Sequence, residues 1–234
     1  MRQRIMQEVG RSDAKASEMA DLYIASAINR YRHIRFWFNT SNFTLTAVAG
    51  QSGYTISADA TPAAAEIPWD FIRVIRMEWR DSSNSAVRGQ IEPASIDEVD
   101  DALSDSGGTN GPPRVFTYHD SQLILAPAPD QAYTISVEYV KDIGTPGAIY
   151  NTTAAKFLVS DPDDSTTTLS GAYTNAWYTH AEELTRSRAK RMFYAEYLKD
   201  SEGAAIEAET ERVAFSELQG LSPRRMQQTR KGWS

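Results

Sequence analysis

The sequence predicts an α+β protein: an antiparallel β-sandwich-like body in the middle of the chain, an N-terminal helix and long C-terminal helices that form a helical bundle, and an extended C-terminal arm. The β prediction rests on Tyr133, Ile135, Val137 and Tyr139, which alternate with polar residues as in a strand with one buried face. The helical prediction rests on apolar residues that recur every three or four positions near both ends of the chain.

These patterns divide the chain into five predicted segments. They are an N-terminal helical segment over 1–39, a β-sandwich body over 40–140 with a short helix over 93–103, a projecting loop or hairpin over 141–176, C-terminal helices over 177–220, and an extended arm over 221–234. A chain of 234 residues is long enough to bury a core without help from metals or disulfides.

A helix is predicted from Ser12, which is a suitable N-cap, to about Tyr31. It ends near the aromatic cluster Phe36-Trp37-Phe38, which arginines flank. We interpret this cluster as the helix end packing on the sheet, with the arginines in solvent. A platform on which nucleic-acid bases stack is the alternative.

Three strands are predicted in the first half of the body. Residues 43–48 and 54–56 are joined by a glycine-containing turn, which indicates a hairpin. Further on, Ile75, Met77 and Trp79 alternate with charged residues and predict a longer strand with one buried face. The short helix that follows starts at Pro93 and carries several acids. We interpret these acids as a solvated helix face, because their spacing matches no calcium loop.

The C-terminal helical pattern begins near residue 175 and includes Trp177 among its packed residues. Glu182 and Arg186 are expected to form an ion pair one helical turn apart. Gly203 is expected to break or kink the helix, and the pattern then stops at Gly220.

Composition argues against an enzyme. The chain has no cysteine, which excludes thiol nucleophiles, disulfides and cysteine-ligated metals. The histidines His33, His119 and His180 lie in separate segments, without the spacing of metal ligands. No phosphate loop, dinucleotide fingerprint or serine-hydrolase elbow occurs. We therefore predict a protein that is not an enzyme and that uses no metal or cofactor.

Charge and hydropathy limit the classes of partner that the chain is expected to bind. The formal net charge is −7, so the whole chain is not a nucleic-acid binder by bulk electrostatics. No segment approaches the ~20 consecutive apolar residues of a membrane span. We predict a soluble, unexported protein that does not contact a membrane.

The C-terminal arm is the strongest functional candidate in the sequence. It has no clear period, and it combines positive charge with apolar anchors, which suits an arm that docks on a partner. A frayed terminus is the alternative interpretation. The predicted docking residues are Arg224, Arg225, Met226, Arg230, Lys231 and Trp233.

Several short motifs also occur in a distinctive order. They are Arg35-Phe-Trp-Phe-Asn39, the strand Phe43-Thr-Leu-Thr with a turn from Gly50 to Tyr54, Ile67-Pro-Trp-Asp-Phe-Ile-Arg-Val, Gly111-Pro-Pro-Arg, Leu123-Ile-Leu-Ala-Pro-Ala-Pro-Asp, and a terminal helix with Trp177. In this order they resemble the head-to-tail adaptor (connector) proteins of tailed bacteriophages, called tail tubular protein A in short-tailed phages. The resemblance covers most of the chain and is weakest over 141–176.

This resemblance implies a structural virion protein, made in the host cytoplasm. Its subunits would form a dodecameric ring at the head-tail interface, between the portal protein and the tail tube or nozzle protein. Packaged DNA would pass through the channel without sequence-specific binding, and an acidic wall would not adhere to phosphate. The arm would bind the portal. The acidic turn with Asp161, Asp163 and Asp164 would face the tail.

Two other functions are compatible with the sequence. A polysaccharide-binding β-sandwich module of a virion would expose aromatic residues and bind glycans as a monomer. A virion-associated cell-wall hydrolase would need a catalytic pair of carboxylates.

Overall fold

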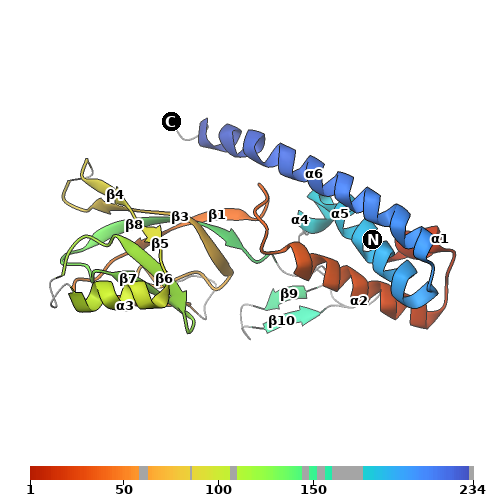
Figure 1. The fold of residues 1–234 in the computed structure, drawn as a ribbon, viewed down its shortest axis with the longest axis horizontal. Coiled ribbons are helices and arrows are strands. Elements are labelled where there is room, and N and C mark those ends of the chain that lie inside the picture. The colour runs from red at the N-terminus through yellow and green to blue at the C-terminus, as the bar shows by residue number, and fades with distance from the viewer. Residues whose placement is uncertain are drawn as a thin grey trace. The chain divides into compact units, whose positions relative to one another are not determined.

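The computed structural model describes residues 1–57, 63–84, 86–105, 110–143, 148–151, 156–159 and 176–231. The chain divides into two compact units (Figure 1). A helical unit contains residues 1–39, 142–150 and 157–234, and a β unit contains residues 40–141 and 151–156. Helices and antiparallel sheets together make the chain an α+β protein, as the sequence predicts.

The β unit contains two four-stranded sheets around one apolar core. The first has the order β1-β8-β3-β4, with bounds Thr40–Thr46, Tyr133–Lys141, Phe71–Asp81 and Arg88–Gln90. The second has the order β2-β7-β6-β5, with bounds Gly53–Thr55, Gln122–Ala126, Val115–His119 and Glu92–Pro93. Both sheets contribute side chains to the core, for example Leu45 and Leu125. This is the arrangement of a β-sandwich.

The central strand β8 behaves as its alternation predicts. Tyr133, Ile135, Val137 and Tyr139 are all buried. The strand pairs antiparallel with β1 on one side and with β3 on the other, so its backbone groups are satisfied along both edges. One face of β8 therefore forms part of the core.

The predicted hairpin over 43–48 and 54–56 is wrong. Strand β1 pairs with β8 in the first sheet, whereas β2 pairs with β7 in the second. Leu45 of β1 and Tyr54 of β2 are both buried in the shared core. The turn reverses the chain, but the two strands contribute to the core from different sheets.

The short helix α3 spans Ile96–Asp105, so it does not begin at Pro93, which belongs to β5. A capping box sets its start: the Ser95 backbone N–H donates to Glu98 Oε2 at 2.8 Å, and the Glu98 N–H donates to Ser95 Oγ at 3.3 Å. Val99 is buried, and the acids Asp97 and Asp100 lie on the exposed face.

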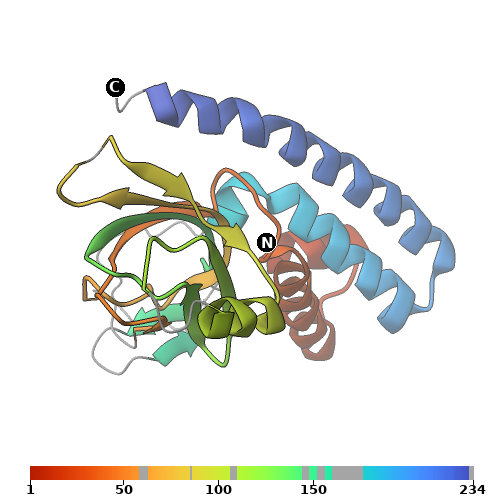
Figure 2. The same cartoon turned by 60° about the vertical axis from the view of Figure 1, so that its left-hand side comes forward.

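The described helices of the other unit come from both ends of the chain. Their bounds are α1 Arg2–Val9, α2 Ala14–Tyr31, α4 Ala176–His180, α5 Glu182–Met192, the π-helical turn η1 Phe193–Leu198, and α6 Ser201–Lys231. Helix α5 packs against α2 and α6, as the two views in Figures 1 and 2 show. A separate two-stranded sheet pairs β9 (Ala148–Asn151) with β10 (Lys156–Val159).

Helix α1 is not expected from the sequence. It is only eight residues long, and Ile5 and Met6 are its buried residues. Gly10 ends it with a φ of 67°, a left-handed conformation that favours glycine. The next helix is capped by Asp13 and not by Ser12 as predicted, because Asp13 Oδ1 accepts a hydrogen bond from the Ala16 N–H at 2.9 Å.

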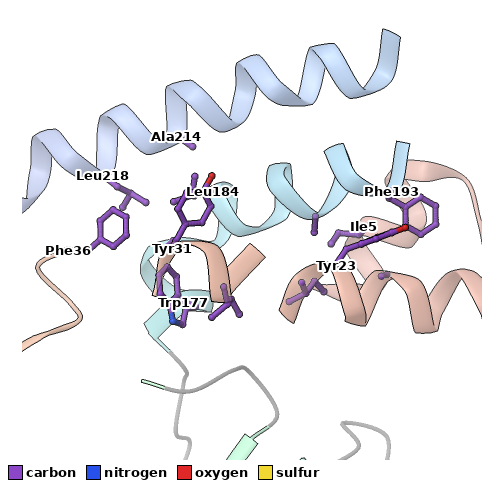
Figure 3. Close-up of a cluster of buried hydrophobic side chains, with 14 of the residues drawn as sticks. Ile5, Tyr23, Tyr31, Phe36, Trp177, Leu184, Phe193, Ala214 and Leu218 are labelled. Atoms are coloured by element: carbon purple, nitrogen blue, oxygen red, sulfur yellow. The ribbon is translucent and has the colours of Figure 1, made fainter. Parts of the chain in front are cut away.

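The aromatic cluster after α2 packs in the helical core, not on a sheet as predicted (Figure 3). Phe36 and Phe38 stack with ring centroids 5.3 Å apart. Trp177 of α4 meets both of them edge-on, at 6.0 and 5.2 Å. Because Phe36 and Phe38 are buried, they are not available to stack on bases.

Asn39 holds the turn that carries this cluster. The Asn39 side chain is buried, and its Oδ1 accepts a hydrogen bond from the Phe36 N–H at 2.7 Å. Its Nδ2 donates to the carbonyls of Ile34, at 2.8 Å, and Arg32, at 3.2 Å. One amide therefore satisfies three backbone groups where the helical hydrogen bonds end.

We expect Asn39→Ala to lower the free energy of unfolding by about 2–3 kcal/mol, because one buried and two partly buried backbone groups lose their partner. Chemical denaturation followed by circular dichroism measures this change. Asn29→Ala, on the exposed face of α2, is the matched control and should cost less than about 1 kcal/mol. Equal losses in the two variants would contradict the role assigned to Asn39.

The chain reverses before α6 at Lys199 and Asp200, not at Gly203. Lys199 adopts a left-handed conformation with φ 58°. Asp200 then caps α6, because its Oδ1 accepts the N–H groups of Glu202 and Gly203 at 3.1 and 3.0 Å. Gly203 lies in the first turn, where an added Cβ would be 2.8 Å from the Tyr194 ring. Glycine is needed there for close approach, not for a kink.

Candidate functional site

The candidate site is a surface of α6. Ion pairs to α5 hold that helix in place, and α5 is itself paired with α1. Glu8 of α1 lies 2.5 Å from Arg186 and 2.9 Å from Lys190, both on α5. The Lys190 Nζ also lies 2.5 Å from Oε1 of Glu207, a buried residue of α6. One lysine therefore links the carboxylates of two helices.

These contacts shift the pKa values of both partners. Burial raises the pKa of Glu8, but the hydrogen bond and charge of Lys190, with Arg186 and Arg4, outweigh burial and lower the pKa below its ordinary value. Burial lowers the pKa of Lys190, but the hydrogen bonds and charges of Glu207 and Glu8 outweigh burial and raise this pKa above its ordinary value. The stabilisation from Glu8 is therefore present above its unfolded pKa and is lost as the pH falls through its folded pKa.

Glu211 forms a second link between α6 and its neighbours. Its carboxylate lies 3.3 Å from Arg188 and 3.1 Å from Arg191, and it accepts the hydroxyl hydrogen bond of Tyr31. Burial, followed by the hydrogen bond to Glu211, raises the pKa of Tyr31. Phe215 stacks on the same tyrosine ring at 5.8 Å. The inner face of α6 is thus fixed by both charge and packing.

The predicted pair between Glu182 and Arg186 is wrong. Glu182 instead pairs with Arg4 of α1 at 3.0 Å, and Arg186 pairs with Glu8. The one-turn spacing allows a pair along α5, but α1 lies alongside and offers opposite charges to both residues. Helix α1 is absent from the sequence-based prediction, so its contacts are absent as well.

The outer face of α6 forms a shallow groove with α5, which we call the α6 groove. Its volume is about 500 Å³. Ile206 and Val213 lie in it with 62% and 44% of their surfaces exposed. The groove is lined by Ile206, Val213, Thr210 and Ala214, and by the carboxylates of Glu183, Glu209 and Glu217. It therefore combines exposed apolar side chains with acidic ones.

Ile206 and Val213 fall within the predicted C-terminal helical pattern, but that pattern does not identify this groove. The signal that separates the two faces is the stripe Glu207, Glu211, Ala214, Leu218 and Ser222, whose spacing repeats every three or four residues and whose members are all buried. The stripe is hard to recognise in the sequence because two of its buried members are glutamates, which are ordinarily exposed. The apolar residues seven positions apart at 206 and 213 fall outside it.

The predicted extended arm is helical in the structure. Helix α6 continues past Gly220 to Lys231, so Arg224, Arg225, Met226, Arg230 and Lys231 lie in its last turns. The packed face of α6 also extends beyond Gly220, because Ser222 is buried and its hydroxyl donates to the Leu218 carbonyl at 2.9 Å. A single proline, Pro223, removes one backbone donor. Trp233 lies outside the described residues.

Other predicted site residues are placed as follows. Asp161, Asp163 and Asp164 lie outside the described residues. His33 and His180 belong to the helical unit, and His119 belongs to the β unit. His180 lies against the Trp37 ring, with centroids 4.3 Å apart. Within the described ranges, no group of three or more metal-ligating side chains is suited to hold an ion.

Helix α6, at 31 residues, is the longest helix in the part of the chain that the structure describes. Charged residues interrupt it throughout. None of the described helices is both long enough and apolar enough to cross a membrane.

Comparison with known proteins identifies the family. A search of curated proteins finds no match for the chain. A protein-family model described as SU10 adaptor protein matches residues 1–232, which is nearly the whole chain. The resemblance to phage head-to-tail adaptors is thereby confirmed, whereas the narrower assignment to tail tubular protein A is not tested. The chain belongs to the SU10 adaptor protein family and is a structural adaptor component of a phage virion.

Proposed function

We propose that this chain is the subunit of a dodecameric ring in the virion neck that joins the portal to the tail tube or nozzle and forms part of the DNA channel. Membership of the adaptor family supports this proposal. The observation that carries it is the separation of charge: the chain has a net charge of −7, yet residues 224–231 contain four bases and no acid. The proposed channel wall is therefore acidic, whereas the proposed docking segment is basic.

Each charge suits one task. An acidic wall repels DNA phosphates, so DNA can slide past without adhering. A basic segment with Met226 nearby can steer onto an acidic partner surface and then anchor there. The helical turns over 224–231 present this segment at the end of α6.

The experiment is portal capture measured by mass photometry of the chain, alone and mixed with its portal ring. We expect a ring-sized complex with the full chain and none with a chain that ends at Ser222. This truncation keeps the buried stripe of α6 and removes the basic segment. Unchanged capture by the truncated chain would refute portal docking by this segment.

A matched pair of variants separates docking from general charge. Arg224→Gln with Arg225→Gln should weaken capture of the portal by about tenfold or more, because two charge-assisted contacts are lost. Arg11→Gln with Lys15→Gln removes the same charge from an exposed part of the helical unit. This control should capture the portal as the unmodified chain does.

The orientation in the neck is also a proposal. The helices would lie near the portal, and the sandwich, with the turn at Asp161, Asp163 and Asp164, would face the tail. Crosslinking in assembled particles tests this orientation. Crosslinks from that turn to the portal would refute it.

A further inference from the structure

The α6 groove leaves large apolar side chains uncovered on a helix that is otherwise well anchored. Ile206 has the highest exposed fraction among the large apolar residues whose burial the structure describes, and Val213 lies two turns further along the same helix. Glu183, Glu209 and Glu217 line the same groove. Exposed apolar surface rimmed by charge is typical of an interaction site.

The chemistry of the groove defines its occupant. Apolar side chains between carboxylates suit a segment that carries basic and apolar residues together. The chain itself has such a segment in the last turns of α6, with Arg224, Arg225, Met226, Arg230 and Lys231. The segment has four bases and the groove has three glutamates, of which Glu209 also pairs with Arg212, so the two surfaces remain complementary in sign.

The segment cannot enter the groove of its own molecule. Groove and segment belong to one continuous helix, which runs from Ser201 to Lys231. Each residue adds about 1.5 Å along a helix axis, so Arg224 lies roughly 10 Å beyond Glu217 and farther still from Ile206. A kink at Pro223 would bend the helix without reversing it. The occupant must therefore come from another molecule.

We propose that the α6 groove of one copy binds residues 224–231 of a second copy. The contact uses two different surfaces of the chain, so it can repeat around a ring or be exchanged reciprocally in a dimer. In the absence of the portal, the basic segment is then held by a neighbouring copy. Groove and portal compete for the same segment, which couples portal docking to release from the groove.

The test uses the full-length chain without portal and measures self-association by sedimentation velocity across concentration. The unmodified chain should associate. Glu209→Lys with Glu217→Lys should weaken association by at least about tenfold, because like charges then meet across the contact. Arg224→Glu with Arg225→Glu should do the same. A mixture of these two variants should associate again, because a basic groove then meets an acidic segment.

The control is Asp97→Lys with Asp101→Lys, which makes the same charge change on the exposed face of α3 in the other unit. Circular dichroism confirms that each variant is folded. A monomeric unmodified chain, unchanged association of the groove variant, or failure of the mixture to associate would each overturn the inference. Portal capture distinguishes this contact from the proposed function, because the groove variant keeps its basic segment and should still capture the portal.

Discussion

Replacing Trp177 with alanine is expected to lower the free energy of unfolding of the helical unit by about 3–5 kcal/mol. Trp177 is fully buried and is among the largest such side chains in the described residues. It meets Phe36 and Phe38 edge-on, and Figure 3 shows it below Tyr31 and Leu184. Removing the indole leaves a cavity that aromatic rings on a tight turn cannot fill by moving.

Urea denaturation followed by the helical circular dichroism signal measures this loss. Most helical residues belong to the helical unit, so the signal reports on that unit even if the two units unfold separately. The matched control is the neighbouring aromatic residue Tyr178, which is 39% exposed. Tyr178→Ala should cost about 1 kcal/mol or less. A similar loss in both variants would refute the assignment of Trp177 as a core anchor.

The second large effect is expected at Glu211. We expect Glu211→Gln to lower the free energy of unfolding by about 2–3 kcal/mol, because Arg188 and Arg191 lose the charge that compensates them. Arg191 is partly exposed, which places the expected loss below that of a fully buried pair. Glutamine keeps an oxygen that can accept the Tyr31 hydroxyl hydrogen bond, so the substitution isolates the effect of charge.

Glu209→Gln is the control for this substitution. Glu209 also pairs with an arginine, Arg212 at 2.5 Å, but its side chain is 63% exposed. Solvent screens such a pair, so the expected loss is below about 0.5 kcal/mol. The comparison is made by denaturation at low and high salt. A loss at Glu209 equal to that at Glu211 would show that burial of the carboxylate does not matter.

These two predictions differ in how far the sequence supports them. Trp177 is recognisable as a packed residue, because it stands in an apolar helical pattern. Glu211 is not, because a glutamate in a charged helix is ordinarily a solvated residue. Its partners Tyr31 and Arg188 are 180 and 23 residues away along the chain. Only folding brings this carboxylate to them.

In the candidate site, too, some features can be recognised in the sequence and others only in the folded chain. The four bases after residue 223 and the acids before it can be read from the sequence, and so can the motifs that resemble phage adaptors. The groove cannot, because it depends on which face of α6 packs against α5. Glu207 and Glu211 are on the packed side, and Ile206 and Val213 are on the open side. This is the reverse of what residue type alone would suggest.

By itself, the sequence determined the α+β class, the strand β8, the helix α2, the burial of Trp177 and the adaptor resemblance. These depend on local periodicity and on the order of motifs, which are properties of neighbouring residues. The tertiary structure decided that β1 and β2 join different sheets, that Glu182 and Arg186 pair with α1, and that α6 continues past Gly220. Each of these outcomes depends on long-range contacts and burial, because strand partners, ion-pair partners and helix ends are chosen by what packs beside them.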